Sequence, residues 1–120
     1  MIVDVAVPVS QYPGLVEAAE QAFAAHGLQA CMVGHAGDGN LHPLVPYTPG
    51  DRISYDNALD AQMEIVEAAI AMGGTATGEH GVGIGKRRFM ALEHGDSLDL
   101  MRTIKDAVDP NGIMNPGKIF

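Results

Sequence analysis

The sequence contains no tryptophan, one cysteine and only 7 lysine and arginine residues against 15 aspartate and glutamate residues. A lone cysteine excludes an intrachain disulfide and is typical of a reducing compartment. The mostly apolar run around Cys31 predicts a buried, unreactive thiol. Because phosphate binding needs clustered basic residues, and Lys86 to Arg88 form the one cluster, the composition argues against nucleic acid or an anionic membrane as the main partner.

Long apolar runs are also missing. No stretch reaches the roughly 18 apolar residues of a membrane span, and the N-terminus lacks the basic and apolar segments of a signal peptide. The composition therefore predicts a cytoplasmic protein with no transmembrane segment. The 120 residues, 47% of them hydrophobic, can bury one core. They cannot also hold a full dinucleotide-binding domain, so a large cofactor would be shared with another domain or subunit.

The order of expected elements is that of a ferredoxin-like split βαβ unit, an α+β fold with both helices on one face of an antiparallel sheet. Alternation of Val3, Val5 and Val7 with Asp4 and Ala6 predicts a first strand with one buried face. The further elements expected in this unit are a helix from Pro13 to His26, strands at 28–33 and 41–47, a helix at 55–72 and a short strand at 75–77.

Two more helices are expected after this unit, at 86–93 and 97–108. Asp96 followed by Asp99 resembles a capping box at the start of the second. The chain then turns twice, at 109–112 and 115–118.

Two histidines, His35 and His42, flank a turn-rich segment between the strands at 28–33 and 41–47. At the base of one hairpin they can face a common point, and imidazole is a natural ligand for a divalent transition metal. On the pair alone, structural or simply exposed histidines are the more common interpretation.

Glu79 and His80 lie between Gly78 and Gly81. With His35 and His42, Glu79 completes a set of two imidazoles and one carboxylate that leaves positions open on a metal. His80 would then be free as a general base. A salt-bridged surface turn is the alternative, and adjacent side chains can share a site only if the backbone turns there.

The glycine-rich segment from Gly81 to Arg87 does not match a nucleotide-binding loop. Arg87 stands where a phosphate loop has Ser or Thr, and Lys86 stands where the dinucleotide fingerprint has its third glycine. A flexible turn leading into a helix is the better interpretation.

Three segments together, HAGDGNLHP at 35–43, GGTATGEHGVGIGKR at 73–87 and IKDAVDPNGIMNPGKI at 104–119, resemble the C-terminal domain of FAD-linked oxidases of the vanillyl-alcohol oxidase type. The resemblance is strongest to D-lactate dehydrogenase and the FAD subunit of glycolate oxidase. It implies a domain over 1–120 that binds substrate and a divalent metal (zinc, manganese or iron) through His35, His42 and Glu79, with His80 as the base. It also implies that Asn115 and Lys118 contact flavin or substrate, although a plain chain-terminal turn explains them equally well.

The resemblance further implies oxidation of a D-2-hydroxy acid, of D-lactate or glycolate type, to the 2-oxo acid. The family's N-terminal FAD-binding domain has no counterpart in these 120 residues. We therefore expect the isolated chain to be inactive and to need an FAD-binding domain or subunit as its partner. The competing hypothesis is a non-catalytic ferredoxin-like module that binds metal or self-associates as a homo-oligomer.

Overall fold

A computed structural model describes residues 1–29 and 31–120, which form two compact units, Met1–His80 and Gly81–Phe120. No helix within the described residues has the length and apolarity that crossing a membrane requires. Each unit is considered by itself below.

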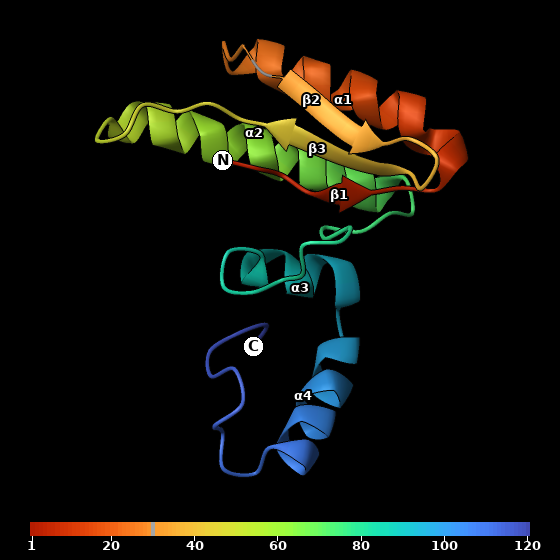
Figure 1. Cartoon of the computed structure of the whole chain (residues 1–120), viewed down its shortest axis with the longest axis vertical. Helices are drawn as coiled ribbons and strands as arrows, with labels where there is room; N and C mark the ends of the chain where they lie inside the picture. Colours follow the sequence, from red (N-terminus) through yellow and green to blue (C-terminus); the bar gives the residue numbers. More distant parts are fainter. Residues whose placement is uncertain (30) are drawn as a thin grey trace. The chain divides into compact units, whose positions relative to one another are not determined.

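The first unit contains a three-stranded antiparallel sheet (Figure 1). Its strands β1 (Val5–Ala6), β2 (Cys31–His35) and β3 (Asn40–Leu44) lie in the order β1-β3-β2. The hairpin thus places β3 between β1 and β2, as in a split βαβ unit. The strand expected at 75–77 is reduced to one antiparallel bridge between Ala6 and Thr75. The predicted α+β class is confirmed.

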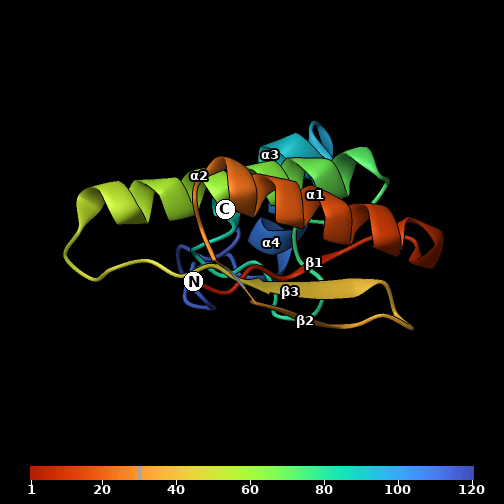
Figure 2. The ribbon, with the colours of Figure 1, turned by 90° about the horizontal axis from the view of Figure 1, so that it is seen from above.

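Two helices, α1 (Tyr12–Ala25) and α2 (Arg52–Ala71), pack side by side on one face of this sheet (Figure 2). A 3-10 turn at Val9–Gln11 leads into α1, which has Pro13 in its first turn and ends before Gly27 at a φ of 64°. Helix α2 begins three residues earlier than expected, because the Asp51 carboxylate caps it by accepting hydrogen bonds from the N–H groups of Ile53 and Ser54.

The core of this unit lies between the sheet and the two helices. Val3, Val5 and Val7 are buried as the alternation predicts, and so are Leu15 of α1 and Ile65 of α2. The second face of the first strand is not solvated, however. Asp4 is 0% exposed because the chain at residues 77–80 crosses it and donates backbone hydrogen bonds to its carboxylate.

The prediction of a buried thiol at Cys31 is wrong. Cys31 is exposed because β2 is the outer strand of the sheet and most of its residues face solvent. The strand also begins later than expected and runs on to His35. Ala30, inside the expected strand, lies outside the described residues.

The second unit contains the two expected helices, α3 (Arg87–His94) and α4 (Ser97–Val108). The capping box is wrong: Asp96 has helical backbone angles, and its side chain makes no capping hydrogen bond. After α4 the tail turns back, and the Ile119 N–H donates to the carbonyl of Gly83 at 2.9 Å. The Arg87 guanidinium also donates to the carbonyl of Gly117 at 3.2 Å.

Candidate metal and catalytic site

The hairpin positions both histidines of the first motif on one face of the sheet. In the β2–β3 register Val33 is opposite His42, so His35, two residues after Val33, shares that face with His42. The two imidazole rings meet edge to face, with centroids 5.4 Å apart. The spacing of the two histidines therefore produces the common point that the sequence predicts.

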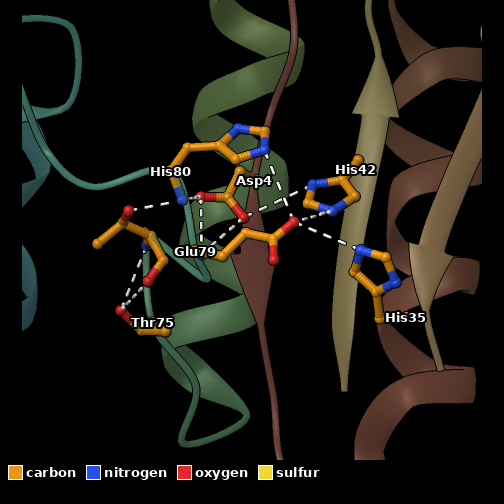
Figure 3. A network of polar contacts seen from close by, with 7 residues as sticks. Asp4, His35, His42, Thr75, Glu79 and His80 are labelled. Atoms are coloured by element: carbon orange, nitrogen blue, oxygen red, sulfur yellow. Dashed lines mark hydrogen bonds and ion pairs between the residues drawn. The ribbon is translucent and has the colours of Figure 1, made fainter. Parts of the chain in front are cut away.

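Glu79 and His80 reach the same point from a bend, not from a strand. The bend approaches the sheet closely at Gly78: a Cβ on this residue would lie 2.5 Å from Asn40 Oδ1 and 2.7 Å from Asp4 Oδ1. Only glycine permits this approach without displacing those side chains. The turning backbone directs both side chains toward the sheet, which satisfies the condition for neighbours to share one site (Figure 3).

One carboxylate oxygen, Glu79 Oε1, lies at the centre of three imidazoles (Figure 3). It is 3.1 Å from His42 Nε2, 3.4 Å from His35 Nε2 and 3.8 Å from His80 Nε2. The rings of His42 and His80 stack in parallel with centroids 4.9 Å apart. His42 is nearly buried, whereas the other three side chains are about half exposed and accessible to a small molecule.

The donor atoms of His35, His42 and Glu79 fit a divalent cation. One ligand atom from each lies within 4.8 Å of the other two, and the set combines two imidazole nitrogens with one carboxylate oxygen. Asp4, His42 and His80 form the second such group among the described residues. The two groups share His42. Its Nε2 faces Glu79 and its Nδ1 faces Asp4, so the nitrogen that binds a metal determines which group forms the site.

Asp4 is the residue of this site that the sequence reasoning missed. Its carboxylate accepts hydrogen bonds from the backbone N–H groups of Glu79, at 3.2 Å, and His80, at 3.0 Å, and from the Thr77 hydroxyl at 3.4 Å. It also lies 3.6 Å from His42 Nδ1. The available signal was an acidic residue within an otherwise apolar strand, which strand alternation assigned to solvent.

The predicted flavin-contact residues, Asn115 and Lys118, belong to the second unit. They form one turn, in which the Lys118 N–H donates to the Asn115 carbonyl at 3.2 Å and Asn115 has a φ of 47°. Both line a pocket of about 220 Å³ with Lys105, Met114 and Phe120. Their role stays a prediction.

Comparison with known proteins bears on the whole chain. The sequence model of the family described as "FAD linked oxidases, C-terminal domain" matches residues 1–119. The chain is 47% identical over 119 residues to a mitochondrial D-lactate dehydrogenase [cytochrome] of Saccharomyces cerevisiae, covering 98% of this chain and 20% of the relative. It is 40% identical over 118 residues to the glycolate oxidase subunit GlcD of Bacillus subtilis, covering 98% of this chain and 25% of the relative.

A plant relative shows the same relation. The mitochondrial D-lactate dehydrogenase [cytochrome] of Arabidopsis thaliana is 40% identical over 121 residues, covering all of this chain and 21% of the relative. The chain thus spans between a fifth and a quarter of the length of these three relatives.

Proposed function

Because the chain belongs to the C-terminal domain family of the FAD-linked oxidases, we propose that it supplies the metal site and the base of a flavoenzyme that oxidises a D-2-hydroxy acid to the 2-oxo acid. Two observations support the proposal: relatives named D-lactate dehydrogenase and glycolate oxidase subunit match along the chain, and four side chains of its motifs converge in space.

The convergence of His35, His42 and Glu79 is the observation that carries this proposal. These three residues would hold zinc, manganese or iron, which share a preference for such ligands. When bound, the cation would polarise the hydroxyl and carboxylate oxygens of the substrate, and FAD on the partner would accept the hydride. The rings of His35 and His42 lie on one side of the Glu79 carboxylate, and the ring of His80 lies on the other (Figure 3).

His80 is the residue we assign as general base. Its ring is about half exposed and stacks on His42, so it stands beside the metal ligands without needing to be one. A neutral imidazole nitrogen can accept the hydroxyl proton of the substrate as the carbon-bound hydrogen departs as hydride. The stacking against the nearly buried His42 fixes the plane of the base.

The partner of this chain would be an FAD-binding domain or subunit. Helix α4 has no buried residue, and Leu100, Ile104 and Val108 form an exposed apolar stripe along it. Exposed apolar patches mark interaction surfaces. We assign the stripe to contact with the FAD-binding part, and Asn115 and Lys118 to contact with flavin or substrate. A second copy of this chain is the alternative partner for the stripe.

Cytoplasmic location stays a prediction, since relatives named mitochondrial are among those matched.

Metal binding by the chain tests the proposal. A calorimetric titration of the purified chain with Zn²⁺ is expected to show one binding site, which is lost in His42→Ala. The matched control is His26→Ala. The His26 ring pairs with Glu64, at 2.9 Å between Nε2 and Oε1, and is not one of the proposed ligands. Absence of a stoichiometric site in the wild type, or its persistence in His42→Ala, would contradict the proposed metal site.

Flavin dependence tests the division of labour. The isolated chain is expected to be colourless and inactive with D-lactate, and to support D-lactate oxidation when joined to the flavin-binding part of a relative. Tight FAD binding by the isolated chain would contradict it. So would failure of the joined, flavin-loaded protein to be reduced by either D-lactate or glycolate.

A further inference from the structure

A fully buried carboxylate lies directly behind the proposed ligands. Asp4 is 0% exposed, and a buried anion is costly unless hydrogen bonds compensate its charge. The compensation comes from the turn that carries the site: both oxygens lie within 3.3 Å of the Glu79 N–H, and Oδ2 also accepts from His80 N–H and the Thr77 hydroxyl. The charge of Asp4 therefore holds together the backbone from which Glu79 and His80 project.

The same carboxylate faces the inner nitrogen of His42. Asp4 Oδ1 lies 3.6 Å from His42 Nδ1, while Nε2 of the same ring faces Glu79 Oε1 at 3.1 Å. Nδ1 is buried and makes no hydrogen bond to any described residue. A small shift of the ring would close this gap, and hydrogen bonds at catalytic sites commonly tighten when ligands bind.

Asp4 suits an orienting role better than a ligand role. Its two oxygens already accept from three donors, the backbone N–H groups of Glu79 and His80 and the Thr77 hydroxyl. It lies on the Nδ1 side of His42, whereas Nε2 faces the exposed carboxylate of Glu79. A metal-ligating histidine typically donates its other ring N–H to a carboxylate or carbonyl, which fixes the tautomer and the direction of the ligating lone pair.

We propose that Asp4 is the positioning residue of this site: it keeps the proton of His42 on Nδ1, so that Nε2 presents its lone pair to a divalent metal, and it clamps the turn bearing Glu79 and His80. This inference rests on the metal site proposed above. One buried anion thereby sets two of the three ligands and the orientation of the base. Gly78 belongs to the same device, because its lack of a side chain lets the turn approach Asp4 and Asn40.

The tautomer of His42 is the direct readout. In the full chain labelled with ¹⁵N-histidine and loaded with Zn²⁺, long-range ¹H–¹⁵N spectra are expected to show His42 protonated on Nδ1 and coordinated through Nε2. Coordination through Nδ1, or a His42 that does not ligate, would overturn the inference. This measurement uses the wild-type chain, so it decides the question even if substitutions at Asp4 prevent folding.

Asp4→Asn gives the quantitative test, with the exposed Asp60→Asn of α2 as a control for the loss of one negative charge. The side-chain amide that this substitution introduces can donate to His42 Nδ1, which favours the tautomer whose proton blocks Nε2. We expect Zn²⁺ affinity to fall about 10- to 100-fold, and the visible spectrum of bound Co²⁺ to change, with Asp60→Asn unchanged in both. A folded Asp4→Asn chain with wild-type affinity and spectrum would overturn the inference.

The outcomes separate this inference from the proposed function. If wild-type chain binds no Zn²⁺, the metal site itself fails and Asp4 has no ligand to position. If the wild type binds Zn²⁺ through His42 and Asp4→Asn binds it equally well, the metal site stands and only the role of Asp4 fails. A purely structural role would lower the melting temperature of Asp4→Asn while leaving the Co²⁺ spectrum of the folded protein as in wild type.

Discussion

Residues 1–80 and residues 81–120 differ in how they use apolar side chains. Among the described residues, the first unit buries aliphatic side chains from its sheet and both helices, whereas the buried apolar residues of the second are Phe89 and Met90. The second unit instead leaves Leu100, Ile104 and Val108 exposed. The three proposed metal ligands, the proposed base His80 and Asp4 all belong to the first unit. The difference shows that the residues of the proposed site stand on a packed scaffold, whereas the second unit exposes apolar side chains along α4.

The largest expected effect is on catalysis. In the chain joined to a flavin-binding part, His80→Gln is expected to lower turnover of a D-2-hydroxy acid about 10²- to 10⁴-fold, because general-base catalysis is lost. Zn²⁺ affinity is expected to stay near that of wild type, since His80 is not in the proposed ligand set. His94→Gln in the second unit is the control. Wild-type turnover in His80→Gln would show that His80 is not the general base.

Stability gives the next largest effect. Leu15→Ala is expected to cost about 2–5 kcal/mol, because Leu15 is fully buried between helix and sheet and its truncation leaves a cavity. Leu100→Ala on α4 removes the same atoms from an exposed position and is expected to change stability by less than about 0.5 kcal/mol. Urea unfolding of both variants measures the comparison. Equal losses would show that α4 is packed in solution.

The tail of the second unit is held by polar contacts around Asp109, the residue that follows α4. A hydrogen bond from the Lys105 ammonium lowers the pKa of Asp109 below its ordinary value of 3.8; burial opposes this, and the N–H groups of Met114 and Ile113 lower it further. The stabilisation of the turn is therefore fully present above that ordinary value and is lost as the pH falls through the lowered pKa.

Asp109→Asn should reproduce the acid effect at neutral pH. We expect faster hydrogen exchange at the Ile113 and Met114 amides, with the amides of β3 unaffected, because the substitution removes the charge that those two N–H groups face. Asp99→Asn, at an exposed carboxylate of the same unit, is the control. Unchanged exchange in Asp109→Asn would show that the tail is held by other contacts.

The smallest expected effect concerns Cys31. Because it is exposed on the outer strand, Cys31→Ser should change the free energy of unfolding by less than about 0.5 kcal/mol. The wild-type thiol should react with a disulfide reagent in the native chain without prior unfolding. A thiol that reacts only after unfolding would restore the buried thiol that the apolar run predicted.

Local patterns predicted the elements and the pair of histidines well. Proline and glycine punctuation set the limits of α1, and the strand register brought His35 and His42 to one face because their spacing follows from the hairpin itself. Long-range relations were beyond such patterns. Asp4 looked like a solvent-facing strand residue because the turn that buries it lies some 75 positions later in the chain.

Edges and caps explain the other differences. The run around Cys31 has the composition of a buried strand, but its place at the outer edge depends on the pairing of β1 with β3. Asp51 caps α2 ahead of the first periodic apolar residue, whereas Asp96, with the better motif, makes no cap. Capping depends on the backbone angles at one residue, and residue type alone does not determine them.

A crystal of the chain grown with Zn²⁺ and measured at the zinc absorption edge tests the central claim most directly. The account predicts one anomalous peak about 2.0–2.2 Å from Nε2 of His35, Nε2 of His42 and a carboxylate oxygen of Glu79, with Asp4 bonded to His42 Nδ1. A peak coordinated by Asp4, His42 Nδ1 and His80, or no peak among these residues at saturating zinc, would contradict it.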